Sequence, residues 1–289
     1  MLTSAQLETF EERGIVRLQG AFSGDSARAM VERVWEALGR RGVERDAPET
    51  WPTGTIDKLQ NLKSHQVFDA IGSDVLMSSV DQLLGAGRWR VPKEWGQFLI
   101  SFPSHAAEAT DSSARSEGWT IPHHVWHTDF SFRLPDPPLF GALVFSFLGD
   151  VPPGSGGTVV VRSSHHLMRR FVEQRPSCGQ EKMKVTREAF LRSDPWLRAL
   201  ASEDEGDAED RVQQFALRDH TIRGVPVRVV ELCGDAGDVI LCHPWMLHAS
   251  ADNAGTTPRM MRVQRIHIVR PAPDDAQGRE PTGAIPPRS

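Results

Sequence analysis

A histidine and a carboxylate two positions apart are the first residues in this sequence whose spacing could do chemistry. Of the eleven histidines, only His127 has an acidic residue two positions later, Asp129. On an extended strand, residues i and i+2 project to the same face, so the imidazole and the carboxylate would lie side by side as ligands for one metal ion. Composition alone yields about one or two such pairs by chance, so the motif needs support from elsewhere in the chain.

That support lies more than a hundred residues downstream. His248 occupies a strand-like run, Ser250 would point to the same side, and a turn-rich stretch then leads into a run beginning at Arg259. If the two runs form a hairpin centred between Asn253 and Ala254, Arg259 is placed directly across from His248. Opposed residues have Cβ atoms about 5 Å apart, so a guanidinium would lie beside the third candidate ligand.

Two histidines and one carboxylate on one face predict a particular metal chemistry. Such a facial triad leaves three coordination positions open and is typical of non-haem Fe(II) oxygenases. The planar fork of an arginine binds a carboxylate in bidentate fashion, which a lysine cannot match. Together, the predicted ligands His127, Asp129 and His248 and the predicted clamp Arg259 indicate Fe(II) with 2-oxoglutarate as cosubstrate and O2 as oxidant.

Two alternatives from other classes use the same residues. A zinc-dependent hydrolase could hold its metal on His127, Asp129 and His248, although it would have no need of Arg259 at that place. A non-catalytic binding protein would need neither the metal nor its ligands. Dependence of succinate formation on Fe(II) separates the first alternative from the oxygenase, and tolerance of Asp129→Ala would identify the second.

The elements that must position these residues differ along the chain. Residues 1–90 are predicted to be mostly helical, with a capping box at Thr3 and Gln6, a helix end at Gly14, and a short strand over 15–18. A second helix is expected after Asp25 or Ser26. A third runs from residue 73 to Gly85. These helices are expected to cover one face of a sheet.

From about residue 96 the pattern changes to short β-type runs separated by turn residues, which indicates a sandwich or barrel. The expected strands span 96–101, 126–132, 140–148, 157–162, 225–232, 239–242, 246–250 and 259–269. A helical insertion is expected over 165–215, with its acidic run 203–210 as a solvated loop. The tail 271–289 is expected to be loose. No linker divides the chain, so we expect one domain over 1–289 with its β core at 96–270.

Composition limits the classes of partner. The net charge is −5, which gives no long-range attraction to nucleic acid. The longest nearly apolar run, 139–148, has ten residues, well short of the ~20 that cross a bilayer. With three cysteines and no recognisable export signal, a cytoplasmic enzyme of a small-molecule substrate is the natural expectation. The sequence does not indicate an oligomeric state.

Three segments resemble the phytanoyl-CoA dioxygenase family of Fe(II)/2-oxoglutarate oxygenases, over approximately residues 5–270. They are Trp126-His127-Thr128-Asp129, the stretch 156–166 that ends in Ser164-His165-His166, and the stretch from Gly237 through His248, Ser250 and Asn253 to Arg259. One departure is Ser163, where the family commonly has glycine.

The resemblance implies a fold and a set of roles. The fold would be a double-stranded β-helix, or jelly roll, mainly β with helices packed on one side. The iron ligands would be His127, Asp129 and His248, and the 2-oxoglutarate clamp would be Arg259 assisted by the Ser250 hydroxyl. The implied activity is hydroxylation or another oxidation of a small, partly apolar metabolite, with release of succinate and CO2. Because many relatives act on secondary metabolites, a substrate from secondary metabolism is expected.

Other residues receive expectations from their positions alone. Gln97, on the strand before a polar loop, is expected to reach the cosubstrate or the substrate, or else to face solvent. Arg133 is expected on the surface. His123, His124 and His220 are expected in loops, and His243 in the core, because it lies five residues before His248 and would point to the opposite face.

Overall fold

The computed structural model describes residues 1–53, 56, 59–104, 119–129, 140–175, 181–202 and 208–269. Its helices are α1 (Ser4–Arg13), α2 (Gly24–Gly39), α3 (Asp74–Leu84), α4 (Ser164–Glu173), α5 (Met183–Leu191), α6 (Pro195–Leu200) and α7 (Ala208–Val212), with short turns η1 (Pro48–Thr50), η2 (Gln60–Leu62), η3 (Gln66–Ile71) and the π-helical η5 (Gln213–Leu217). Its strands are β1 (Ile15–Leu18), β2 (Trp89–Arg90), β3 (Gln97–Ser101), β4 (Phe140–Phe147), β5 (Thr158–Val161), β6 (His220–Ile222), β7 (Val225–Val227), β8 (Val229–Glu231), β9 (Val239–Cys242), β10 (His248–Ser250) and β11 (Arg259–Ile268).

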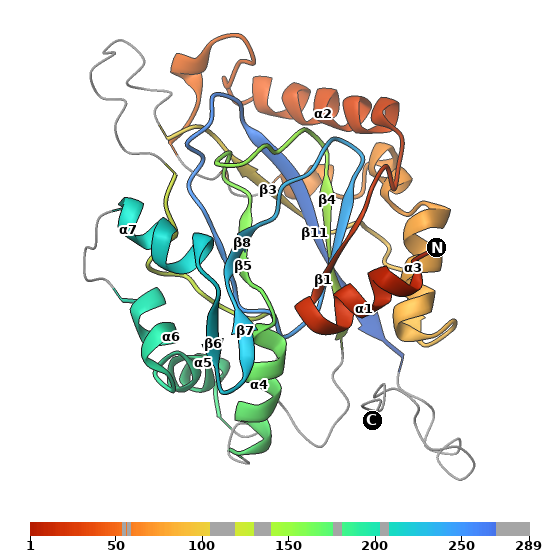
Figure 1. Cartoon of the computed structure of the whole chain (residues 1–289). Coiled ribbons are helices and arrows are strands. Elements are labelled where there is room, and N and C mark those ends of the chain that lie inside the picture. The colour runs from red at the N-terminus through yellow and green to blue at the C-terminus, as the bar shows by residue number, and fades with distance from the viewer. Residues whose placement is uncertain are drawn as a thin grey trace.

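The strands form two principal antiparallel sheets. The large sheet has the order β1-β9-β4-β11-β2, and β3 also pairs with β11. The small sheet has the order β10-β5-β8, and β6 and β7 form a separate hairpin. Figure 1 shows the large sheet running through the middle of the molecule, with helices on two sides. The fold is therefore a mixture of helices and antiparallel sheets.

Each face of the large sheet packs into its own core. One face is covered by the N-terminal helices: Met30 and Val34 of α2 and Leu76 and Val80 of α3 lie in the same cluster of buried side chains as strand residues such as Val144. The other face packs against the small sheet and the helices α4 to α6. Both faces of strand β4 are buried, which explains why its sequence is apolar apart from Ser146.

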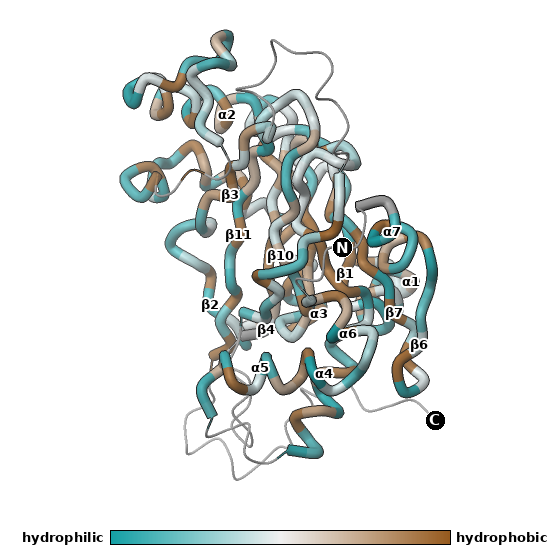
Figure 2. The backbone as a smooth tube through the Cα atoms, turned by 90° about the vertical axis from the view of Figure 1, so that its left-hand side faces the viewer, coloured by the Kyte–Doolittle hydropathy of each residue, from teal (hydrophilic) through white to brown (hydrophobic). Residues whose placement is uncertain are grey.

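Helix α1 begins and ends where the sequence predicts. Thr3 and Gln6 form a reciprocal capping box on α1, and Gly14 closes that helix with a φ of 76°. The second helix begins slightly earlier than expected, because Ser23 caps it. Figure 2 shows polar and apolar residues alternating along α2, as expected for a helix with one buried face.

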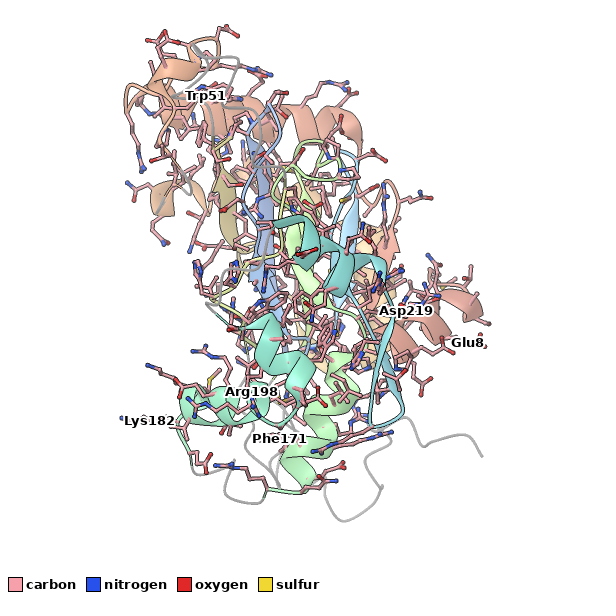
Figure 3. All side chains as sticks on the ribbon, turned by 60° about the vertical axis from the view of Figure 1, so that its left-hand side comes forward. Glu8, Trp51, Phe171, Lys182, Arg198 and Asp219 are labelled. Carbon is pink, nitrogen blue, oxygen red and sulfur yellow. The ribbon has the colours of Figure 1, made fainter. Side chains whose placement is uncertain are left out.

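The helical insertion lies on the far side of the small sheet from the N-terminal helices (Figure 1). Its charged side chains, such as Lys182 beside α5, project from the outside of the molecule, as does Glu8 of α1 (Figure 3). The prediction of a loop over 203–210 is wrong for its last residues, because helix α7 begins at Ala208. Residues 203–207 and the predicted loose tail 271–289 lie outside the described residues. His220 was expected in a loop, but it begins strand β6.

The most consequential wrong prediction concerns β10 and β11. They do not form a hairpin: β10 pairs with β5, so that His248 is opposite Val160, whereas β11 pairs with β4, β3 and β2. His248 and Arg259 therefore belong to different sheets. Among the described helices, none has the length and hydropathy of a membrane-spanning segment.

Candidate metal centre

The two candidate histidine ligands are cross-strand neighbours. The backbone N–H of His127 donates to the carbonyl of His248, and the N–H of His248 donates to the carbonyl of His127, both at 2.9 Å. This isolated antiparallel bridge places the imidazole centroids 4.2 Å apart. The segment 126–132 was expected to be a regular strand, but among its described residues only His127 makes a β bridge, and residues 130–132 lie outside the description.

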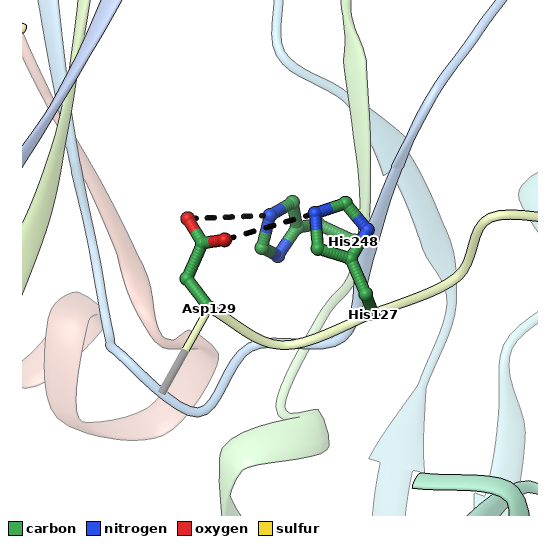
Figure 4. Close-up of side chains that lie close together, drawn as sticks. All are labelled: His127, Asp129 and His248. Atoms are coloured by element: carbon green, nitrogen blue, oxygen red, sulfur yellow. Dashed lines mark ion pairs between the residues drawn. The ribbon is translucent and has the colours of Figure 1, made fainter. Parts of the chain in front are cut away.

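Asp129 completes a three-residue cluster. Its Oδ1 lies 3.8 Å from Nε2 of His127, and its Oδ2 lies 3.9 Å from Nε2 of His248. One ligand atom from each residue falls within 4.8 Å of the others. Figure 4 shows the carboxylate facing both imidazoles. The structure thus brings together the three residues that the sequence proposes as ligands.

Backbone carbonyls orient both rings. Nδ1 of His127 lies 2.7 Å from the carbonyl oxygen of Val125, and Nδ1 of His248 lies 3.0 Å from that of Met246. With the proton on Nδ1, each ring presents the lone pair of Nε2 toward Asp129, which is the arrangement that ligating histidines require. Val125, two residues before the first candidate ligand, adopts a left-handed φ of 57°, an uncommon conformation for a β-branched residue.

Helix α4 supports the segment that carries His248. The Oγ of Ser164 accepts the N–H of Leu247 at 2.9 Å, next to the residue whose carbonyl orients His248. The side chain of His165 follows on the same helix and is almost fully buried, with its Nε2 3.0 Å from the carbonyl of Glu11. The family-like Ser-His segment therefore has a structural role among the described contacts.

The electrostatic environment favours metal binding. Burial, together with the neighbouring His127, lowers the pKa of His248 to about 4, so the imidazole is neutral near pH 7 and can donate a lone pair. Burial alone would raise the pKa of Asp129, but His248 and a hydrogen bond from Arg265 outweigh it and lower that pKa. A neutral imidazole at His248 and an ionised carboxylate at Asp129 are the protonation states that metal ligands need.

The donor set and its spacing fit a divalent transition metal. Bonds of about 2.1 Å place neighbouring ligand atoms of such an ion about 3 Å apart, so the cluster is slightly wider than a loaded site. His127 and Asp129 lie on one segment and His248 on another. The side of a bound metal ion that faces away from these two segments would remain for further ligands. His127, Asp129 and His248 can therefore hold a metal through three protein atoms.

Arg259 is fully buried between the two sheets, with 1% of its surface exposed. Its Nη1 donates to the carbonyl of Gly156, and Nε has no hydrogen-bond partner among the described residues. Burial lowers the pKa of Arg259 to about 10, so it remains charged at neutral pH. Glu231 lies near it; burial raises the pKa of Glu231, while the N–H groups of Gly154 and Gly157 oppose that shift.

Arg259 reaches the small sheet at the end where Ser250 lies. In the β10–β5 register, Ser250 is opposite Thr158 and His248 opposite Val160, and Gly156 precedes this ladder on the same chain segment. Along the direction of this ladder, Ser250 therefore lies between His248 and the Arg259 guanidinium. The Ser250 residue is exposed. Arg259 is not paired across from His248, as the sequence predicted. Its guanidinium still approaches the small sheet from the large sheet.

Gln97 lies across from Val263 on β11, so it shares the sheet face of Arg259 by strand alternation. Its side chain is exposed and lines a cavity of about 890 Å³ at the sheet edge. The basic residues of that cavity are Lys63, Arg90, Lys93 and His267.

The remaining histidines lie away from the cluster. The rings of His165 and His166 lie 4.0 Å apart, and those of His165 and His243 lie 4.6 Å apart. His243 precedes β10 outside any strand, and His123 and His124 lie in the loop before His127. Arg133 lies outside the described residues.

Sequence reasoning missed Arg265 and Glu231. Nη2 of Arg265 donates to Oδ1 of Asp129 at 2.8 Å. Arg265 and Arg259 are six residues apart on one strand and so share a face, but this spacing alone does not pair Arg265 with Asp129. Glu231 is the last residue of β8 and carries no comparable spacing signal.

Comparisons with known proteins agree with this geometry. The sequence model of the phytanoyl-CoA dioxygenase family (PhyH) matches residues 10–261. No functionally curated protein shows significant sequence similarity to the chain.

Several solved structures are similar. HygX from Streptomyces hygroscopicus, with nickel and 2-oxoglutarate bound, is 16% identical with a TM-score of 0.50, covering 92% of this chain and 87% of HygX. AviO1 from Streptomyces viridochromogenes Tue57 is 17% identical with a TM-score of 0.49, covering 94% and 98%. SnoK, a non-heme alpha ketoglutarate dependent carbocyclase from nogalamycin biosynthesis, is 18% identical with a TM-score of 0.47, covering 92% and 84%.

At such identities the likeness to HygX concerns the fold alone. The family match covers most of the chain and includes the three clustered residues. The chain therefore belongs to the phytanoyl-CoA dioxygenase family, which confirms the resemblance of its motifs.

Proposed function

We propose that this protein is an Fe(II)- and 2-oxoglutarate-dependent dioxygenase that hydroxylates, or otherwise oxidises, a small and partly apolar metabolite of secondary metabolism. The single observation that carries the proposal is the cluster of His127, Asp129 and His248 within a chain of the phytanoyl-CoA dioxygenase family. Two imidazoles and one carboxylate are the ligands typical of non-haem Fe(II) oxygenases.

The cosubstrate assignment is supported by a buried cation. Arg259 has an unsatisfied Nε and remains charged, so it can pair with the distal carboxylate of 2-oxoglutarate, and Ser250 can donate its hydroxyl to the same group. HygX, which has a similar fold, binds 2-oxoglutarate together with nickel. Gln97, on strand β3 next to β11, is a candidate contact to the cosubstrate or substrate.

The architecture of the proposed enzyme is one domain over 1–289 with a jelly-roll core at 96–270. Two packed antiparallel sheets with a buried interior support this proposal. The N-terminal helices would serve as a cover for the large sheet, and the insertion 165–215 as a cover for the small sheet.

Each of these residues has a defined task in the proposed reaction. Bound Fe(II) and 2-oxoglutarate would supply the oxidising power, with succinate and CO2 as products of the cosubstrate. His127, Asp129 and His248 would hold the metal through one atom each. Arg259 orients the cosubstrate by its distal end. The burial of His248 and Arg259 keeps water away from both anchors.

The test is succinate formation by the full-length protein with Fe(II), 2-oxoglutarate, ascorbate and O2, during a screen of small apolar metabolites. We expect succinate formation to depend on Fe(II), to be stimulated by one class of metabolite, and to be abolished by Asp129→Ala. The control His124→Ala removes an exposed imidazole from the same segment and should preserve activity.

Two outcomes would contradict the proposal. Hydrolysis that requires zinc, with no succinate formed, would favour a zinc hydrolase on the same three ligands. If Asp129→Ala binds metal and behaves like the wild type in every assay, a non-catalytic binding protein is the better interpretation.

A further inference from the structure

The two oxygens of Asp129 have different surroundings. Each oxygen faces one imidazole, Oδ1 at 3.8 Å from Nε2 of His127 and Oδ2 at 3.9 Å from Nε2 of His248. Only Oδ1 also accepts a hydrogen bond, at 2.8 Å from Nη2 of Arg265, whereas Oδ2 accepts none from the described residues. The Asp129 side chain is 11% exposed, so water has little access to either oxygen. One oxygen is therefore engaged by a cation of the protein, and the other is free to ligate.

The position of Arg265 is fixed by the large sheet. It lies in the middle of β11, opposite Leu143 of β4, on the face that Arg259 also occupies. Its Nε is buried without a partner among the described residues, while the side chain as a whole is 40% exposed. Arg265 thus extends from a paired strand to the carboxylate, and its reach does not depend on a loop.

The mode of carboxylate binding matters for this class of metal site. A carboxylate that ligates through one oxygen completes a three-atom facial triad and leaves three of six positions open. If both oxygens of Asp129 ligated, only two positions would remain. A cosubstrate that chelates through two atoms would fill both, and none would remain for O2.

We propose that Arg265 is a positioning residue that keeps Oδ1 of Asp129 away from the metal, so that Asp129 ligates through Oδ2 alone. This inference rests on the proposed function, because it concerns the same metal centre. Arg265 acts through Asp129 and does not itself touch the reacting atoms. Its planar fork also holds the carboxylate in one orientation, which a lysine ammonium does not.

The proposal gives a specific pattern of effects. Arg265→Met keeps most of the side-chain length but removes the charge and the donors. Loss of a cation beside the metal favours metal binding, whereas loss of the fixed orientation of the Asp129 carboxylate opposes it. Because the two effects offset each other, we expect the dissociation constant for Co(II) to stay within about threefold of wild type. 2-Oxoglutarate could still chelate at the two remaining positions, but the cation beside the metal is gone and a fourth protein atom ligates, and both changes weaken the binding of an anion. The dissociation constant for 2-oxoglutarate should therefore rise about tenfold or more.

The experiment uses the full-length protein loaded with Co(II) under anaerobic conditions, since the visible spectrum of Co(II) reports its coordination. Affinities for Co(II) and then for 2-oxoglutarate are measured for wild type, Arg265→Met, Arg265→Lys and the control Arg90→Met, together with thermal melting. Arg90 is an exposed arginine on the neighbouring strand β2, opposite His267. We expect a changed Co(II) spectrum in Arg265→Met, partial recovery in Arg265→Lys, and wild-type behaviour in Arg90→Met.

Either of two results would overturn the inference. One is an Arg265→Met protein with the wild-type Co(II) spectrum and wild-type affinity for 2-oxoglutarate. The other is a parallel loss of Co(II) and 2-oxoglutarate binding in both Arg265 variants, which would make Arg265 a support of the fold only. A wild-type protein that binds neither Co(II) nor 2-oxoglutarate would overturn the proposed function, and this inference with it.

Discussion

Arg259 is a buried cation whose hydrogen-bonding capacity is only partly used. It donates to one backbone carbonyl, its Nε has no partner among the described residues, and its nearest acid, Glu231, already accepts two backbone N–H groups. Leaving a charged donor without a partner in the interior is costly, so such a group has a strong tendency to bind an anion. A dicarboxylate that binds the metal with its other end is a suitable anion.

For Arg259→Ala we expect the 2-oxoglutarate concentration that gives half-maximal succinate formation to rise about 10- to 100-fold, as for loss of one charged hydrogen-bonded pair. Arg259→Lys should give a smaller rise, because it keeps the charge without the fork. Arg162→Ala, which removes a cation paired with exposed Asp219, serves as the control. An unchanged requirement in Arg259→Ala would show that the clamp lies elsewhere.

The cluster of candidate ligands could be predicted only in part from local signals. His127 and Asp129 are two positions apart, whereas His248 was assigned through a hairpin that does not form and through the resemblance of its segment to the family. Arg265 could not be predicted in the same way. Its contact with Asp129 joins residues 136 positions apart, and that contact depends on the register between β11 and β4.

At the scale of elements, the end of helix α1 packs against the segment that carries His248. Gly14 ends the helix in a left-handed conformation with a φ of 76°, and a Cβ at this position would lie 2.4 Å from Sδ of Met246 and 2.7 Å from Nδ1 of His165. Met246 supplies the carbonyl that orients His248. Helix α1, helix α4 and the segment before β10 therefore meet at one glycine.

Gly14→Ala should destabilise the protein by about 2–4 kcal/mol, because the left-handed conformation and the overlap with two side chains both carry a cost. Gly20→Ala is the matched control: its φ is +55° and nothing lies within 4 Å of the added Cβ, so only the conformational cost of about 1–2 kcal/mol applies. Urea denaturation gives both free energies of unfolding. Equal values for the two variants would show that the packing behind Met246 is loose.

Element boundaries were largely predictable, whereas strand partners were not. The capping box at Thr3 and the helix ends at Gly14 and Gly85 are encoded within a few residues. The partner of β10 is instead set by distant contacts. Asn253 donates to the carbonyl of Ser101, and its own carbonyl accepts the N–H of Ser104, so the turn after β10 is tied to the segment after β3 and does not close a hairpin.

For the molecule as a whole, three histidines make stability depend on pH. His165, His166 and His243 form a cluster of tilted neighbouring rings between α1, α4 and the segment before β10, near Arg169. Burial lowers the pKa of His165 to about 3 and also lowers the pKa values of His166 and His243. The unfolded chain therefore binds more protons than the folded protein between about pH 6.5 and pH 3.

A depressed histidine pKa favours the neutral form in the folded state. The contribution of these histidines to the free energy of unfolding should therefore be fully present above about pH 6.5 and should fall as the pH drops toward 3. Each such histidine contributes at most about 1.4 kcal/mol per pH unit in this window. We expect His165→Gln to flatten the profile of unfolding free energy against pH below 6.5, measured by urea denaturation. His124→Gln, an exposed loop histidine, should leave the profile unchanged. A flat wild-type profile would contradict the prediction.

The origin of the metal centre in distant parts of the chain has a consequence for folding. The His127–His248 bridge and the Arg265–Asp129 pair close loops of more than a hundred residues, and the latter needs the last described strand in place. Because such contacts form only after much chain entropy has been lost, the site is complete only late in folding. An ion that recognises all three ligands would therefore stabilise the finished protein and give little help to partly folded intermediates.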